Sequence, residues 1–185
     1  MSTADAGLTA GERARLIQLL RDSEAEFVRL MANLTEAQWT ARPAAGRWSV
    51  QQIAEHIVVG EKATFTMAMQ ALAAAPDPEW QEANARKTQF IEQVLPNRRL
   101  KAMAPDLLVP QRGWTCAETI ARFQQLRAAT VKFVEEIDRP LKDRTSPHPF
   151  PVFGALNALQ WLLYIPLHNM RHNQQIAETL RDLAS

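Results

Sequence analysis

The sequence has little cysteine and no long apolar run, and each shortage excludes a class of protein. The lone cysteine, Cys116, rules out an internal disulfide and any CxxC zinc or redox motif. The longest unbroken apolar run, Trp161–Leu167, is far shorter than the ~20 residues that cross a bilayer. The first residues, Met1–Leu8, lack the basic-then-apolar pattern of a signal peptide. We therefore expect a cytoplasmic protein without a membrane segment.

Neither positive nor negative charge is in clear excess. The chain has 21 Lys and Arg against 20 Asp and Glu, a formal net charge of +1, and both signs are scattered. This balance argues against a nucleic-acid-binding module carried by one basic face. A chain of 185 residues favours a single domain over residues 1–185. Such a domain buries enough apolar surface to fold without a metal or a disulfide.

Four segments begin with a helix-capping motif and continue with apolar residues at helical spacing. In each motif the first side chain and the residue three positions later satisfy free backbone donors of the first turn. The second helix should run to about Ala75, the third should end before Pro140, and the fourth should continue close to the C-terminus. No segment shows sustained period-two alternation, so we expect no sheet. The motifs are Thr9-Ala-Gly-Glu12, Ser49-Val-Gln-Gln52, Thr115-Cys-Ala-Glu118 and Asn157-Ala-Leu-Gln160.

The connections between these helices differ in length. Thr35–Trp48 is a short link with room for one helical turn, and Pro140–Leu156 is a proline-rich, extended loop. Pro76–Trp114 is long enough to cross a whole bundle, and we expect helix around Trp80–Leu95 because long structureless loops are uncommon in compact domains. These lengths predict an all-α four-helix bundle with one long crossover between its second and third helices.

The four histidines include three that the helical periodicity places on inward faces. His168 and His172 are four residues apart, which puts them on one helix face and about 6 Å apart along its axis. His56 shares an inward stripe with Ile53 and Gly60, whose missing side chain leaves room nearby. Three histidines from two facing helices can hold a divalent metal ion and leave one position open. The alternative is that each is an ordinary core or surface histidine.

Two familiar metal motifs are excluded by the neighbouring residues. A zincin protease needs HExxH, because the glutamate is its general base, whereas Asn169 follows His168. A di-iron bundle needs ExxH motifs from two helices. The residues three positions before the histidines are Ile53, Ile165 and Asn169.

The motifs taken in order resemble those of the DinB/YfiT-like superfamily. They are WSVQQIAEHI over residues 48–57 with Glu61 beyond it, PFPVFG over 149–154, Trp161, and His168-xxx-His172-xxx-Ile176, and together they span nearly the whole chain. The resemblance implies an up-down-down-up four-helix bundle and a divalent metal ion, typically zinc or nickel. It places the metal ligands on His56, His168 and His172. Some members are transferases or isomerases that use small cellular thiols, and homodimers are plausible for proteins of this kind.

Several residues near the histidines invite a functional interpretation beside an ordinary one. Tyr164, one turn before His168, can hydrogen-bond a substrate, although an aromatic residue at this spacing is more often core. Gln52 and Gln175 can orient imidazoles, or be merely structural. His148 in the proline-rich loop can reach the open metal position, but a solvated loop histidine is the favoured interpretation.

Three further features have simple structural interpretations. Cys116 lies in the first turn of a helix, where the dipole lowers a thiol pKa, yet an inert buried cysteine is favoured. Arg98, Arg99 and Lys101 form a solvated basic stretch that can also recognise a substrate carboxylate. Pro166 should kink the last helix on the face opposite His168.

These observations predict a metal-dependent enzyme acting on a small molecule, with a small thiol as cosubstrate and Tyr164 as a catalytic candidate. One alternative is a hydrolase that uses a metal-activated water, for which Glu55 and Glu61 are poorly directed as general bases. The other is a non-catalytic binding or stress protein, in which the bundle and the metal hold a small ligand or a dimer interface.

Overall fold

The computed structural model describes residues 6–100 and 104–184, and it confirms the predicted all-α bundle. The four predicted long helices form, and their ends lie within a few residues of the expected ones. The additional helices expected in the connections Thr35–Trp48 and Pro76–Trp114 also form. The elements are α1 (Ala10–Met31), α2 (Glu36–Thr40), α3 (Val50–Ala73), α4 (Trp80–Val94), the 3₁₀ turn η2 (Asp106–Leu108), α5 (Cys116–Glu136), β1 (Thr145–Pro147), the 3₁₀ turn η3 (Pro151–Phe153), β2 (Ala155–Asn157) and α6 (Ala158–Ala184).

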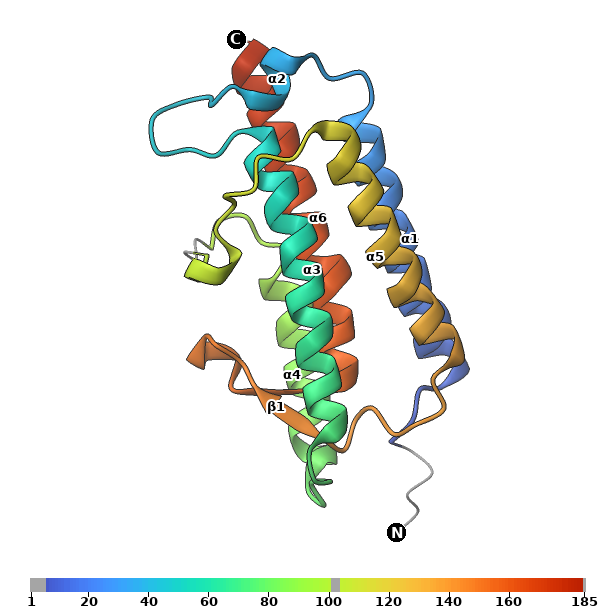
Figure 1. Cartoon of the computed structure of the whole chain (residues 1–185). Coiled ribbons are helices and arrows are strands. Elements are labelled where there is room, and N and C mark those ends of the chain that lie inside the picture. The colour runs from blue at the N-terminus through green and yellow to red at the C-terminus, as the bar shows by residue number, and fades with distance from the viewer. Residues whose placement is uncertain (1–5, 101–103, 185) are drawn as a thin grey trace.

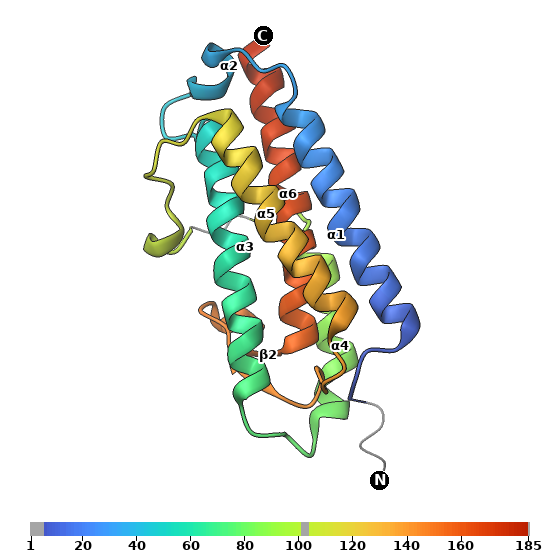
Figure 2. The ribbon, with the colours of Figure 1, turned by 45° about the vertical axis from the view of Figure 1, so that its right-hand side comes forward.

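The helices run up, down, down and up in the order α1, α3, α5 and α6 (Figure 1). The start of α1 and the end of α6 therefore lie at opposite ends of the bundle, and α4 climbs beside the lower half of α6 within the crossover (Figures 1 and 2). The most extensive helix-to-helix contact is between α3 and α6. In the part of the chain that the structure describes, no helix combines the length and apolarity needed to cross a membrane.

The capping motifs explain where the helices begin. Thr9, Ser49 and Thr115 each accept the backbone N–H three residues later in a reciprocal capping box, and Thr35 does the same for α2. At α6 the Asn157 side chain accepts from the Gln160 N–H at 2.8 Å while the glutamine accepts in return at 3.0 Å. All four predicted starts are confirmed, and α6 continues without a break through Pro166.

The expectation of no sheet is wrong. Strands β1 and β2 pair antiparallel, with Ser146 opposite Leu156. Each strand has only three residues, too few to produce a visible alternation in the sequence. The Ser146 hydroxyl donates to the Met67 carbonyl at 3.0 Å and accepts from the Trp161 indole at 2.8 Å, so the hairpin is tied to both α3 and α6.

The apolar core is divided in two by a polar layer at mid-height. One apolar cluster gathers around Leu20, Leu72 and Leu162, and the other around Phe27 and Phe123. Between them along the helices lie buried polar side chains, among them two of the three inward histidines. The buried members of this layer are Ser23, His56, Glu61, Arg127, Thr130, Asn169, His172 and Asn173.

A fully buried guanidinium, that of Arg127 on α5, organises this layer. It donates to both carboxylate oxygens of Glu61 on α3, at 3.0 and 2.9 Å. It also donates to Ser23 on α1 at 2.8 Å, to the Leu20 carbonyl, and to the Asn169 side chain on α6 at 3.2 Å. Charge and hydrogen-bonding capacity are thus matched inside the core, which a buried ion pair requires. One side chain therefore joins all four long helices.

Candidate metal centre

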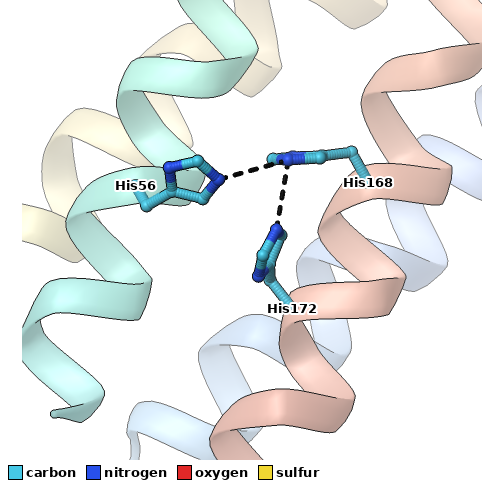
Figure 3. Close-up of side chains that lie close together, drawn as sticks. All are labelled: His56, His168 and His172. Atoms are coloured by element: carbon cyan, nitrogen blue, oxygen red, sulfur yellow. Dashed lines mark hydrogen bonds between the residues drawn. The ribbon is translucent and has the colours of Figure 1, made fainter. Parts of the chain in front are cut away.

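The three inward histidines meet between α3 and α6 (Figure 3). The Nε2 atom of His168 lies 3.3 Å from Nε2 of His56 and 3.1 Å from Nε2 of His172. The three ligand-capable nitrogens all lie within 4.8 Å of one another. A tetrahedral ion with bonds near 2.1 Å would need its nitrogens about 3.4 Å apart. The observed spacing is that of a group able to hold one metal ion.

Two of these rings form a further hydrogen bond through Nδ1, and this bond determines which ring nitrogen carries the proton. His56 Nδ1 lies 2.9 Å from the Leu108 carbonyl oxygen, and His172 Nδ1 lies 2.8 Å from Oε1 of Gln175. A carbonyl oxygen only accepts, so each Nδ1 carries the proton and each Nε2 presents a lone pair. The same Gln175 oxygen accepts from Arg98 at 3.4 Å, which supports this orientation of the amide. Outer partners of this kind hold metal-binding histidines in the right tautomer.

With the protons placed in this way, the converging nitrogens have too few N–H donors for their lone pairs. Two of the three converging Nε2 atoms are lone-pair acceptors, and the neutral His168 ring can place at most one proton on its own Nε2. At least one of the two contacts, at 3.1 and 3.3 Å, therefore brings two lone pairs face to face. A cation between the nitrogens would satisfy all three, so the residues present fit a divalent metal ion.

All three rings are held in the neutral form that metal binding needs. Burial lowers the pKa of His56 and lowers that of His172 to about 3. Burial, together with the two neighbouring imidazoles, also lowers the pKa of His168 well below its usual range. Protons therefore compete only weakly for these nitrogens at neutral pH.

Gly60 makes room for the ring of His168, one of the three candidate metal ligands. A Cβ atom on Gly60 would lie 3.1 Å from Cε1 and 3.5 Å from Nδ1 of His168. The missing side chain thus allows the His168 ring to lie against α3. The sequence predicted free space beside the open metal position here, whereas the structure fills that space with the imidazole of His168.

The part of the crossover that supports His56 was not predicted from the sequence. The buried Glu55 carboxylate accepts three successive backbone N–H groups, from Gln111 at 2.6 Å, Arg112 at 2.7 Å and Gly113 at 3.0 Å. These bonds hold the segment after η2 on α3, and η2 supplies the Leu108 carbonyl to the imidazole next to Glu55. The available signal was Glu55 itself, a carboxylate on a helix turn that is otherwise buried.

Tyr164 lies beside His168, as the sequence predicted. His148 is not the solvated loop residue that the sequence favoured. The Tyr164 ring stacks on His168, with centroids 5.8 Å apart and planes 25° apart. The expectation of a solvated His148 is wrong, because its half-buried ring stacks on Trp161 at 4.9 Å and 12° and lies 5.4 Å from the Tyr164 ring. The hairpin of β1 and β2 holds the loop so that the His148 ring contacts Trp161 and Tyr164 of α6.

The remaining candidates divide between support and structure. Gln175 orients His172, as one of its two interpretations proposed, whereas Gln52 is used in the capping box of α3. Cys116 is half-buried with its thiol 3.8 Å from the Met31 carbonyl, and burial raises its thiol pKa, which agrees with an inert cysteine. Arg98 is not freely solvated, since it pairs with Glu178 at 3.0 Å. Arg99 is exposed, and Lys101 lies outside the described residues.

Comparisons with known proteins agree with this fold. The chain is 25% identical over 167 residues to YuaE, an uncharacterised protein of Bacillus subtilis strain 168, covering 88% of this chain and 95% of YuaE. Its structure is similar to that of YfiT from Bacillus subtilis, described as "a probable metal-dependent hydrolase with an unusual four-helix bundle topology", with a TM-score of 0.63 and 16% identity over 96% of this chain and 90% of YfiT. It is also similar to TT2238, a four-helix bundle protein, with a TM-score of 0.56 and 20% identity over 90% of this chain and 98% of TT2238.

A family model covers most of the chain. The model of the DinB superfamily matches residues 13–176, a span that runs from the first turns of α1 into the last turns of α6 and contains all three converging histidines. This chain is a member of the DinB superfamily.

Proposed function

We propose that this protein is a divalent-metal-dependent enzyme that acts on a small molecule, with His56, His168 and His172 as the metal ligands. The observation that carries the proposal is the convergence of three Nε2 atoms of which two are lone-pair acceptors. Without a metal ion, the lone pairs turned inward by these Nδ1 partners would face one another unpaired, which costs free energy in a buried site. Zinc or nickel is the expected ion, because imidazole ligands suit both.

An ion held by the three histidines would supply Lewis acidity to a substrate atom. The chain itself holds the ligands neutral and fixed: η2 orients His56, Gln175 orients His172, and Gly60 admits the ring of His168. Tyr164 stacks against His168 and is the candidate to contact the substrate beside the ion.

Transfer of a small thiol is the reaction class we favour. Three neutral imidazoles leave the ion its full charge, which favours an anionic partner such as a thiolate. Cys116 does not supply one, because it opens α5 and its thiol contacts the Met31 carbonyl. An external thiol is therefore the natural cosubstrate.

Hydrolysis is the second candidate, supported by the likeness to YfiT and its description as a probable metal-dependent hydrolase. It needs a general base, and the two nearest carboxylates on α3 are engaged elsewhere. Glu55 binds the crossover backbone, and Glu61 pairs with the buried Arg127. Water activation would have to rely on another group, which is why we rank hydrolysis second.

Metal analysis of single variants tests the proposal. Protein purified without an affinity metal column should hold about one divalent ion, and His56→Ala, His168→Ala and His172→Ala should each lower this content sharply. His148→Asn is the matched control and should keep the ion. An unchanged metal content in His56→Ala would refute the three-histidine centre.

An activity assay then separates the two reaction classes. Metal-loaded protein is offered an electrophilic acceptor with bacillithiol, mycothiol or glutathione, and ester or amide substrates in parallel. Turnover that needs metal and thiol together supports transfer, and thiol-independent turnover supports hydrolysis.

The homodimer and the cytoplasmic location expected from the sequence stay predictions, which light scattering and fractionation of cells would test.

A further inference from the structure

The fourth histidine, His148, has the opposite tautomer to His56 and His172. The Phe150 backbone N–H donates to Nδ1 of His148 at 2.9 Å, so this nitrogen carries the lone pair. Burial lowers the pKa of His148 to about 4, so the ring is neutral at physiological pH. A neutral imidazole has one proton, which must therefore be on Nε2. His148 presents an N–H donor where His56 and His172 present lone pairs.

This arrangement excludes His148 as a metal ligand but suits it to hydrogen bonding. Its Nδ1 lone pair is used by Phe150, and its Nε2 is protonated. Within residues 6–100 and 104–184, neither His148 Nε2 nor the Tyr164 hydroxyl has a hydrogen-bond partner in the protein. Neither atom is fully buried, so each can donate to a ligand that approaches from outside. Both rings are half-buried and lie with centroids 5.4 Å apart.

The rings that carry the two donors lie in a row that leads to His168. His148 stacks on Trp161, Tyr164 lies next to His148, and Tyr164 stacks on His168. The row joins the hairpin loop to α6, and its far end is one of the three converging imidazoles.

The loop that carries His148 is held firmly in place. The His148 backbone N–H donates to the Gly154 carbonyl at 2.7 Å across the loop, and Gly154 adopts φ 62°, which glycine tolerates at low cost. The Lys87 ammonium of α4 donates to the Ala155 carbonyl at 2.6 Å. These bonds fix the direction of the His148 ring before any ligand arrives, which lowers the cost of binding.

We propose that His148 and Tyr164 form a donor pair that recognises an acceptor oxygen of the substrate, a carbonyl or carboxylate, while another substrate atom binds the metal. The proposal rests on the proposed function and names its substrate class: a small molecule with a metal-binding atom and an oxygen acceptor on one short chain. His148 is then a substrate-binding residue, outside the set of metal ligands.

Two substitutions separate the donor from the loop bond. In His148→Asn, the side-chain oxygen can still accept from the Phe150 N–H, but the Nε2 donor is lost. In His148→Gln, the amide nitrogen can take the place of Nε2, but the loop acceptor is lost. A matched probe pair, 3-mercaptopropionate and 1-propanethiol, differs in the terminal group alone, which is a charged carboxylate in the first and a methyl group in the second. Titration of the cobalt-loaded protein with each probe is followed by the visible absorption of the ion.

The wild type should bind 3-mercaptopropionate about tenfold or more tightly than 1-propanethiol, as one hydrogen bond to a charged acceptor allows. The ratio should fall toward one in His148→Asn, with cobalt affinity retained, and recover in part in His148→Gln. A ratio that is unchanged in His148→Asn, or a ratio of one in the wild type, overturns the proposal.

Nitrogen-15 NMR of labelled histidines is a second test, and it does not need the metal. His148 should show the Nε2–H tautomer and His56 the Nδ1–H tautomer. An Nδ1–H tautomer at His148 overturns the donor assignment. A wild-type protein that binds no cobalt, or a His168→Ala variant that binds it normally, instead overturns the proposed function, so the two failures are distinguishable.

Discussion

Replacing Glu55 by glutamine should weaken metal binding without touching a ligand. The carboxylate is 2% exposed and accepts three backbone N–H groups of the crossover. Its Oε1 atom accepts two of them and its Oε2 atom the third, from Gly113 at 3.0 Å. A glutamine that keeps the Oε1 bonds would direct its NH₂ group at the Gly113 N–H. The crossover should then loosen, and with it the Leu108 carbonyl that orients His56.

The magnitude follows from the bonds that change. Two charge-assisted bonds become neutral at a loss of about 1 kcal/mol each, and the third is lost at about 1–2 kcal/mol, which totals about 3–4 kcal/mol of loop docking. Loss of an outer partner of a metal-binding histidine lowers metal affinity by about 10–100-fold. We expect Glu55→Gln to fall within that range.

Three measurements follow the chain of cause from loop to metal. Competition with a chelating dye gives the metal affinity, hydrogen exchange gives the protection of the amides of residues 111–113, and nitrogen-15 NMR gives the tautomer of His56. Glu26→Gln is the control, because it also removes one negative charge but from a surface pair with Arg29 on α1. It should leave all three readouts unchanged.

Positioning of His56 through the crossover requires the three readouts to change together. If the metal affinity of Glu55→Gln equals that of the wild type, the loop does not support the centre. If the affinity falls while the amides stay protected and His56 keeps its Nδ1 proton, the loss comes from the missing charge alone. Either result would refute positioning through the crossover.

Three further predictions concern the helices and the hairpin. Gly60→Ala should weaken metal binding by displacing the His168 ring, because its Cβ would lie 3.1 Å from Cε1 of that ring; the same contact offsets the gain in helix propensity of up to about 1 kcal/mol, so metal titrations should show a loss of affinity while thermal melts change by less than about 1 kcal/mol. Arg127→Ala should cost about 3–5 kcal/mol in urea unfolding because Glu61 is left buried and unpaired, and a loss under about 1 kcal/mol would contradict this. Since burial lowers the pKa of His148 to about 4, the unfolded state takes up its proton first; stability should be full above pH ~6.5 and fall as pH drops toward 4, with a shallower fall in His148→Asn.

Local signals in the sequence predicted most of the bundle. Each long helix begins at a capping motif whose two partners are three residues apart, so its chemistry is complete within one turn. The spacing of His168 and His172 likewise determines that they share a face. His56 was placed opposite them by its apolar neighbours, and the structure brings the three side chains together.

What was missed depends on contacts between distant segments. The partner of His56 is the backbone carbonyl of Leu108, 52 residues away, and any residue at that position would offer the same oxygen. Glu55 likewise binds backbone N–H groups, which leave no trace in residue type. The burial of His148 depends on a hairpin whose strands are too short for a period-two pattern. Such contacts become visible only when the chain is folded.

The single guanidinium at the centre of the bundle has a consequence for how the protein opens. Arg127 reaches Ser23 on α1, Glu61 on α3 and Asn169 on α6, so no long helix can leave without stranding a buried charge or its partners. Partial opening is then nearly as costly as complete unfolding. The amides around these four positions should exchange with solvent as one cooperative unit, at the slowest rate in the molecule, while α2 and the crossover exchange faster and independently.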